Sequence, residues 1–176
     1  MKKFILFIWE IVKIAVIALI IVVPIRAFVF QPFFVRGASM EPNFHDFDYL
    51  IVDEISYRVR QPQRGEVIVF YNPNNNSQRF IKRVIGLPGE TIKVEKGEVS
   101  IKQDADFFVL DESKYLDQSV KTPGSKEITL KDNQYFVMGD NRGVSLDSRF
   151  FGALEKKLII GKESFRLWPL SILAKQ

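Results

Sequence analysis

The sequence predicts a mainly β protein, in which an N-terminal transmembrane helix precedes a β-barrel-like domain with a surface insertion. The apolar residues, 47% of the 176 residues, are concentrated at the N-terminus. After residue 35 the apolar runs are short, rich in Val, Ile, Phe and Tyr, and separated by Gly, Pro and Asn clusters, as is typical of strands and turns. We therefore expect an anchor at residues 1–27 and a β domain at residues 28–176, with the insertion at about residues 103–127.

The anchor prediction depends on one apolar segment, Phe4 to Ile25. At the helical rise this segment spans roughly 33 Å, which is close to the hydrocarbon thickness of a bilayer. A cleaved signal peptide and a buried core helix are the alternatives. The segment is longer than the apolar region of a signal peptide and has no small-x-small cleavage site. It also lacks the polar face that a core helix of a small domain should show.

The charges near this segment indicate its orientation. Glu10 and Lys13 are its only charged residues, and their spacing of three puts them on one helix face, where they can pair. Lys2 and Lys3 precede it, so the positive-inside rule places the N-terminus in the cytoplasm and the chain after Arg26 outside.

Short β-prone segments separated by turns make up the rest of the chain. Residues 103–127 have weaker periodicity and more Asp, Ser and Lys, so we expect a surface insertion without chemistry there. Turns are expected at residues 73–76, 87–89 and 96–97. The expected strands are residues 49–53, 66–71, 79–85, 91–94, 99–102, 134–138 and 164–167.

The composition excludes several kinds of site. The chain has no cysteine and one histidine, which excludes a cysteine nucleophile, a disulfide framework, a thiolate zinc site and a multi-histidine metal cluster. A Ser-His-Asp triad would require His45, six residues after Ser39 in a polar stretch, and we consider this arrangement unfavourable. The net charge of +4 fits an anionic membrane surface, and no basic tract favours nucleic acid. No metal or cofactor is expected.

Lys82 lies in the strand expected at residues 79–85. Alternation puts Phe80, Lys82 and Val84 on one face of this strand and the two arginines on the other. A lysine among apolar neighbours loses solvation in its charged form, so its pKa falls and a neutral amine becomes available as a base. A lysine that extends from an edge strand to water is the alternative that this pattern leaves open.

Ser39 follows two small residues in the run 36–42 (RGASMEP). Small residues let the backbone turn sharply and leave the hydroxyl approachable. A serine becomes a good nucleophile only beside a base, and a desolvated lysine is the recognised substitute for histidine. By composition alone, an ordinary turn serine is the favoured interpretation.

A polar run at residues 139–149 (GDNRGVSLDSR) directly follows the strand expected at residues 134–138. Its short polar side chains and two arginines fit a buried network that orients a catalytic amine. They also fit a solvated loop, and the sequence alone leaves both interpretations open.

Together these blocks resemble the bacterial type I signal peptidases, the Ser-Lys proteases of family S26, over nearly the whole chain. Residues 37–42 (GASMEP) resemble the nucleophile box, and residues 48–53 (DYLIVD) resemble the strand that follows it. The lysine box is matched by residues 64–70 (RGEVIVF) and 82–90 (KRVIGLPGE), and the last box by residues 139–142 (GDNR), Ser145, residues 147–149 (DSR) and Gly152.

The resemblance implies a role for each matched residue. Ser39 would form the acyl-enzyme, while Lys82 would take its proton and later activate the deacylating water. Ser145 would hydrogen-bond the Lys82 amine. Asp147 and Arg149 would form a structural ion pair behind the site.

The oxyanion hole and the substrate pockets are less well defined by the resemblance. Some family members place a serine two residues before the nucleophile as an oxyanion donor, whereas this chain has Gly37. The Ser39 N–H remains available, and a Gly37 N–H or a water is expected as the second donor. Shallow apolar pockets are expected to be lined by Phe33, Val35, Met40, Phe80 and Ile81. Ordinary packing of these residues in the core is the alternative.

The resemblance also implies partners and a location. Its substrates are secretory preproteins with small residues at the first and third positions before the cut, and its other partner is the lipid bilayer. We therefore expect a single-pass protein of the bacterial cytoplasmic membrane, with the catalytic domain on the outer side. Residues 28–34 and Trp168 are expected to dip into the outer leaflet.

Two other classes fit parts of the pattern. Self-cleaving Ser-Lys repressors resemble this family in fold, but they carry a DNA-binding helix pair where this chain has its apolar segment. A membrane-tethered β domain that binds a partner without catalysis is the second class. Both Ser39 and Lys82 are present, so only an activity measurement separates it from an enzyme.

Overall fold

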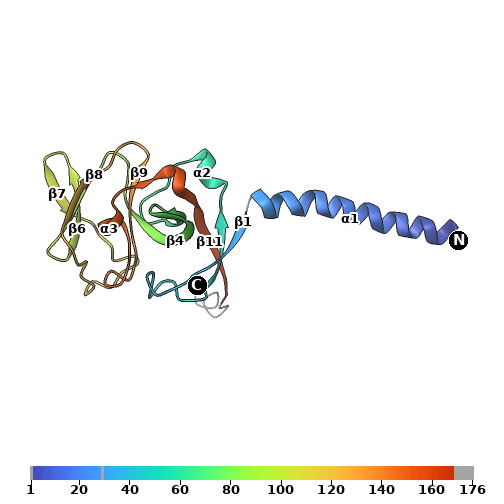
Figure 1. The fold of residues 1–176 in the computed structure, drawn as a ribbon, viewed down its shortest axis with the longest axis horizontal. Helices are drawn as coiled ribbons and strands as arrows, with labels where there is room; N and C mark the ends of the chain where they lie inside the picture. The colour runs from blue at the N-terminus through green and yellow to red at the C-terminus, as the bar shows by residue number, and fades with distance from the viewer. Residues whose placement is uncertain (1, 29, 169–176) are drawn as a thin grey trace.

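The structure of the chain is a computed structural model that describes residues 2–28 and 30–168. One long helix, α1 (Lys2–Phe28), runs away from a body built of two antiparallel β-sheets (Figure 1). The mainly β class predicted from the sequence is confirmed.

Helix α1 lies outside the body and leads into the first strand, β1 (Phe30–Phe34) (Figure 1). The predicted pair in it is formed, because Lys13 Nζ lies 2.6 Å from a carboxylate oxygen of Glu10. Among the residues that the structure describes, no helix has both the length and the apolar character that crossing a membrane requires. The anchor stays a prediction.

Antiparallel pairing joins seven strands in the larger sheet. The pairing order has β1 at one end and β10 at the other, so the described strands form no closed barrel and the barrel-like closure is not confirmed. The strands in spatial order are β1, β2 (Tyr49–Asp53), β11 (Ile159–Trp168), β3 (Val67–Asn72), β4 (Asn75–Gly86), β9 (Gln134–Met138) and β10 (Leu154–Glu155).

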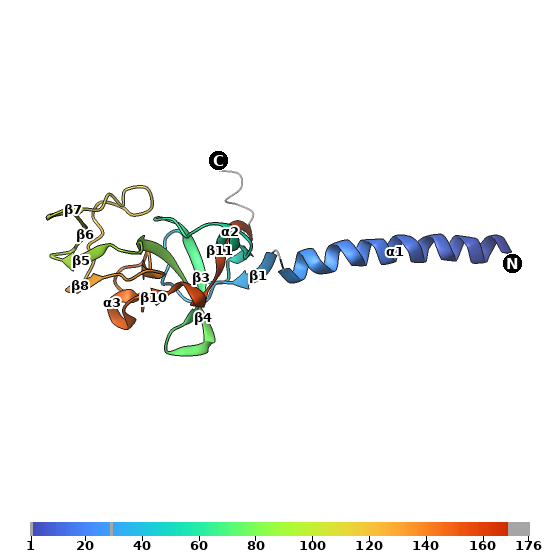
Figure 2. The same cartoon turned by 90° about the horizontal axis from the view of Figure 1, so that it is seen from above.

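The smaller sheet has four strands and forms the end of the body farthest from α1 (Figure 2). Its order is β7 (Asp106–Val109), β6 (Glu98–Gln103), β5 (Thr91–Glu95) and β8 (Lys126–Thr129). The segment predicted as a surface insertion contains β7 and the start of β8. Part of it is therefore sheet, although its periodicity is weak.

The observed strands extend the predicted ones where backbone pairing continues past the apolar pattern. Strand β4 begins at Asn75, directly after a tight turn at Pro73 and Asn74, so its polar first half pairs with the end of β3. Strands β1, β7, β8 and β10 were not predicted. The helices of the body are single turns, α2 (Ser56–Val59), α3 (Ser148–Phe151) and the 3₁₀ turn η1 (Lys156–Leu158).

Buried apolar clusters cover both faces of the β3–β4 hairpin. One face packs Val67, Val69 and Ile81 against Met40 and Phe44 of the β1–β2 connection. The other face places Ile68, Phe70 and Val84 in a second cluster, with Phe80 at its margin. The hairpin is thus a rigid base for residues of β4 and for the connection that lies over it.

Candidate active site

Ser39 lies in the connection between β1 and β2, and buried side chains fix this connection on either side of it. Val35 N–H donates to the carbonyl of Asp48 at 2.9 Å and closes the base of the loop. Val35, Met40 and Phe44 are all buried in the core. Ser39 itself is half-buried, so its hydroxyl is held on a fixed loop and remains accessible.

Lys82 is buried in β4, where its side chain is directed at Ser39. Only 4% of Lys82 is exposed. Its Nζ donates to Ser39 Oγ at 2.7 Å and to the carbonyl of Ile81 at 2.8 Å. The same nitrogen lies 5.3 Å from the centre of the Phe80 ring. The structure therefore brings together the two residues that were predicted to act as nucleophile and base.

The pKa of the Lys82 amine is about 8, lower than the ordinary value of 10.5. Burial is the main cause, because a charged ammonium is poorly solvated there. The negative charges of Asp147 and Asp140 act in the opposite direction and limit the fall. Near neutral pH, the neutral fraction of this amine exceeds that of a free lysine by roughly two orders of magnitude.

Asp147 and Arg149 form the predicted ion pair at the start of α3. Two guanidinium nitrogens of Arg149 each lie 2.8 Å from a carboxylate oxygen of Asp147. Asp147 is fully buried and also accepts the N–H of Gly139 at 3.1 Å. The pair thus fixes the turn after β9, and its supporting role stays a prediction.

Ser145 differs from the prediction. Its Oγ is buried, yet it has no hydrogen-bond partner among the described residues, so the predicted hydrogen bond to Lys82 is not formed. The Lys82 amine is instead directed at Ser39 and at a backbone carbonyl. Ser145 still lies beside the β1–β2 connection that carries Ser39 (residues 35–48, the nucleophile loop), because a Cβ added to Gly139 would meet both Ser145 Oγ and the Ser39 carbonyl.

The N–H of Gly37, which with a water was one of the two predicted candidates for the second oxyanion donor, is already engaged. This N–H donates to Asp46 Oδ1 at 2.8 Å. Its φ of +86° lies in the left-handed region, where a side chain is strained, so glycine suits this position better than serine. The N–H of Ser39 has no recorded backbone acceptor among the described residues and remains the candidate donor.

A groove of about 830 Å³ opens beside Ser39 and Lys82. Of the predicted pocket residues, Phe33, Phe80 and Ile81 line it. Val35 and Met40 do not, because both are in the core, and that part of the prediction was wrong. The lining residues that were not predicted as pocket residues are Phe34, Arg36, Gly37, Ala38, Ser77, Arg79, Val144 and Leu146.

His45 does not take part in the contact between Ser39 and Lys82. Its side chain is exposed, and its recorded hydrogen bonds within the described residues are made by its backbone. It is also absent from the residues that line the groove. The Ser-His-Asp arrangement therefore has no geometric support.

Comparison with known proteins shows the family of the chain. A family model described as "Signal peptidase, peptidase S26" matches residues 8–168. The chain belongs to this signal peptidase family. The assignment confirms the predicted function, that of a serine endopeptidase that removes signal peptides from preproteins.

Individual signal peptidases resemble the chain over most of its length. "Probable signal peptidase I-2" of Synechocystis sp. is 37% identical over 92% of this chain and 73% of its own length. "Signal peptidase I" of Bacillus licheniformis is 34% identical over 99% of this chain and 95% of its own length. A crystal structure of a signal peptidase I from Enterococcus faecalis V583 covers 60% of this chain and 99% of that chain, with 29% identity and a TM-score of 0.48.

Sequence reasoning missed a buried ionic network next to Ser39 and Lys82. Arg83 donates to both carboxylate oxygens of Asp140, at 2.8 and 2.6 Å, and Asn43 Nδ2 donates to the same carboxylate at 2.9 Å. The network joins β4, the nucleophile loop and the turn after β9. Alternation places Arg83 on the same strand face as Ile81 and Ile85, and these apolar neighbours are the signal that could have indicated a buried charge in need of a partner.

Replacing His45 with alanine should leave the activity within about threefold of the parent, because a lysine base makes the exposed histidine dispensable. The rate of precursor cleavage by the purified variant measures this. A loss of about a thousandfold, the scale of removing a triad member, would contradict the lysine mechanism.

Proposed function

We propose that this chain cleaves preproteins by a Ser-Lys mechanism, with Ser39 as the nucleophile and Lys82 as the general base. The observation that carries the proposal is the 2.7 Å hydrogen bond between Lys82 Nζ and Ser39 Oγ, made by a buried lysine of lowered pKa. In its neutral form this amine accepts the Ser39 proton while Oγ attacks the scissile carbonyl carbon. The ion pair of Asp147 and Arg149 supports the turn beside the dyad.

The remaining steps follow from the same two residues. The tetrahedral intermediate collapses, the protonated Lys82 gives its proton to the leaving amine, and the acyl group stays on Ser39 Oγ. The amine of Lys82, again neutral, then takes a proton from a water that attacks the ester. The bond between the acyl carbon and Ser39 Oγ then breaks, and the protonated Lys82 returns its proton to Oγ, which releases the new carboxyl end and restores both residues. The Ser39 N–H is the oxyanion donor that this chain offers.

The groove supports binding of an extended substrate with small side chains. Ala38 and Gly37 leave room beside the nucleophile, while Phe33, Phe80 and Ile81 give the lining an apolar character. Small apolar side chains next to the cut therefore fit this surface better than large or charged ones.

The experiment that tests the function is incubation of the detergent-solubilised protein with a purified precursor. We expect one cut after the signal peptide, identified by the masses of both products, and no cut with the Ser39→Ala variant. A parent protein that binds the precursor without cleaving it would favour the non-catalytic, membrane-tethered binding domain.

We further propose that the protein is a single-pass protein of the bacterial cytoplasmic membrane, with α1 as its anchor. The apolar run from Phe4 to Ile25 and the absence of a packing partner for the exposed side chains of Leu6 to Val22 among the described residues support this. Lys2 and Lys3 support a cytoplasmic N-terminus.

Aromatic side chains at one corner of the larger sheet support a second contact with the bilayer. Tyr49 of β2 pairs with Phe34 of β1 on one side and with Trp168 of β11 on the other. Both Phe34 and Trp168 are more than half exposed. The centres of the Phe34 and Tyr49 rings are 4.7 Å apart. Such rings suit a membrane interface. The predicted surface also includes residue 29 and the side chains of residues 28 and 30, which lie outside the described part of the structure.

The topology predicts that protease added to intact spheroplasts degrades the β domain, because that domain follows the anchor on the outer side. Immunoblotting of the domain before and after treatment measures this, with a cytoplasmic protein as the control for intact membranes. A β domain that survives until the membrane is lysed would contradict both the topology and the secretory role.

A further inference from the structure

Arg142 is buried in the turn after β9, where residues of the smaller sheet region surround its charge. It is 2% exposed and is the largest of the fully buried side chains. Two of its nitrogens donate to the two carboxylate oxygens of Glu112, at 2.8 and 2.5 Å. A third contact of 2.6 Å goes to Thr122 Oγ1. Glu112 and Thr122 both belong to the segment predicted to be an insertion without chemistry.

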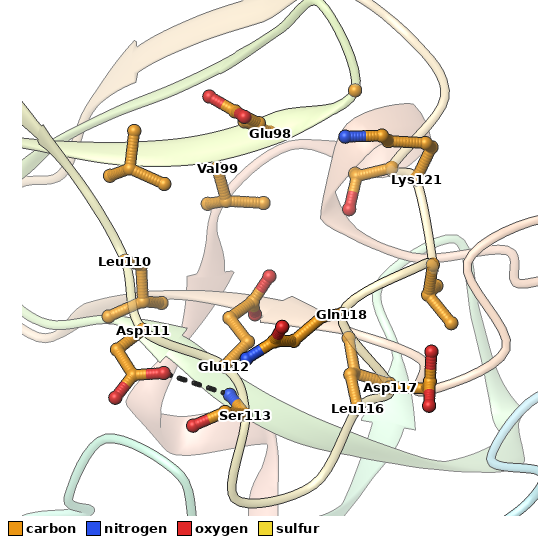
Figure 3. Close-up of a pocket in the computed structure, with 14 residues that line it drawn as sticks. Glu98, Val99, Leu110, Asp111, Glu112, Ser113, Leu116, Asp117, Gln118 and Lys121 are labelled. Atoms are coloured by element: carbon orange, nitrogen blue, oxygen red, sulfur yellow. Dashed lines mark hydrogen bonds between the residues drawn. The ribbon is translucent and has the colours of Figure 1, made fainter.

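Glu112 is the counter-charge of this buried guanidinium. The Glu112 side chain is 15% exposed, and a largely buried charge that loses its partner is strongly disfavoured. Tyr115 strengthens the pair, since its hydroxyl donates to Glu112 Oε1 at 2.8 Å. Figure 3 shows Glu112 between Leu110 and Leu116, among the residues that line a pocket of about 230 Å³.

The turn that carries Arg142 contacts the nucleophile directly. Asn141 N–H donates to the carbonyl of Ser39 at 3.1 Å. Arg142 Nε donates to the carbonyl of Gly139 at 3.1 Å, so the guanidinium also fixes the start of the same turn. Holding Arg142 in place therefore holds the backbone that hydrogen-bonds to Ser39.

A second route runs from the same segment to the two elements that carry the dyad. The carbonyl of Tyr115 accepts a hydrogen bond of 2.7 Å from Asn43, four residues after Ser39. The ring of Tyr115 lies 4.2 Å from the guanidinium carbon of Arg83, the residue after Lys82. The segment around Glu112 and Tyr115 thus contacts the nucleophile loop, the lysine strand and the turn after β9.

We propose that Glu112 is a positioning residue for the peptidase reaction. Through Arg142 it fixes the turn that hydrogen-bonds to Ser39, and it thereby sets the distance between Ser39 Oγ and Lys82 Nζ. The inference rests on the proposed roles of Ser39 and Lys82. Glu112 lies outside the motifs that the sequence shares with the family.

The test is the Glu112→Gln variant of the full-length protein, which keeps the size of the side chain and removes its charge. We expect kcat for precursor cleavage, per folded molecule, to fall tenfold or more, because misplacement by about 1 Å can cost up to ~10²-fold. KM should change little, since neither Glu112 nor Arg142 lines the groove. The acidic limb of the pH profile should keep its midpoint, because Glu112 is not among the charges that shift the pKa of Lys82.

The matched control is Glu98→Gln, the same chemical change in an exposed residue that lines the same pocket (Figure 3). Its kcat should equal that of the parent. A purely structural role for Glu112 predicts lower stability with an unchanged kcat per folded molecule, and that result would overturn the proposal. If the parent does not cleave precursors, the proposed function fails instead.

If Glu112→Gln does not fold, a second variant tests whether Glu112 positions the dyad. Tyr115→Phe removes only the hydroxyl that bonds to Glu112 and keeps both the ring under Arg83 and the carbonyl that binds Asn43. We expect a smaller fall in kcat, about twofold to fivefold, with KM and the pH midpoint unchanged. A kcat equal to that of the parent in this folded variant would then overturn the proposal.

Discussion

Replacing Ser39 with alanine, or Lys82 with methionine, should lower kcat/KM for precursor cleavage by about 10⁴-fold or more. The first change removes the atom that attacks the substrate in the proposed mechanism. The second removes the only base within hydrogen-bond distance of it among the described residues. Cleavage of a purified precursor by each variant in detergent measures both effects.

The same variants should remain folded and inserted in the membrane. Ser39 loses one hydroxyl from a half-buried position, and methionine matches the apolar surroundings that Lys82 has beside Phe80. Thermal unfolding therefore serves as the control for each variant. Turnover near the parent rate in Lys82→Met would show that another group acts as the base.

Replacing Gly139 with alanine should cause the next largest loss, although the change adds one methyl group. A Cβ at this position would lie 2.2 Å from Ser145 Oγ and 2.4 Å from the carbonyl oxygen of Ser39. Both distances are far inside van der Waals contact, and one of the atoms belongs to the backbone, so the nucleophile loop must move. We expect kcat/KM to fall about 100-fold and the free energy of unfolding to fall by about 1–3 kcal/mol.

Gly143→Ala is the matched control for this prediction. It adds the same methyl group to the same loop, where the nearest atom would be Asn141 Oδ1 at 4.0 Å. Its activity and stability should therefore stay close to those of the parent. Equal losses in the two variants would show that the loop tolerates no alanine in general, and that the close approach at Gly139 has no special role.

The dyad was predicted from the sequence mainly because residues 37–42 and 82–90 resemble the nucleophile and lysine boxes of family S26. The residue types alone, without cysteine and with one histidine in a polar stretch, were compatible with a serine–lysine pair but left an ordinary turn serine and a solvent-exposed lysine as alternatives. Alternation in β4 then assigned the correct face to Phe80 and Val84. What the sequence could not supply is the contact itself, which joins residues 43 positions apart.

The errors concern residues whose surroundings are set by tertiary packing. Val35 and Met40 are apolar, as residues that line a substrate pocket often are, but the loop directs their side chains into the core. An apolar side chain suits a pocket and a core equally well, so the sequence could not separate the two. Ser145 Oγ lies where Gly139 closely approaches the carbonyl of Ser39, and the local sequence pattern does not show this approach.

The surroundings of Glu112 could not be predicted from the sequence either, because its partner is far away along the chain. It lies in a polar segment of weak periodicity, so the sequence gives it the appearance of a surface carboxylate. Its partner Arg142 is 30 positions away, in a motif that was itself compatible with a solvated loop. Only the folded arrangement reveals that this segment contacts the dyad region.

The most direct test of the Ser-Lys mechanism is the pH dependence of kcat/KM in the parent and in His45→Ala. In the proposed mechanism the neutral Lys82 amine is the active form, so activity should be low where the amine is protonated and should rise with pH. We expect the midpoint of this rise at about 8, the lowered pKa of Lys82, and we expect the same curve for both proteins. A rise with a midpoint near 6.5 that disappears in His45→Ala would contradict the account.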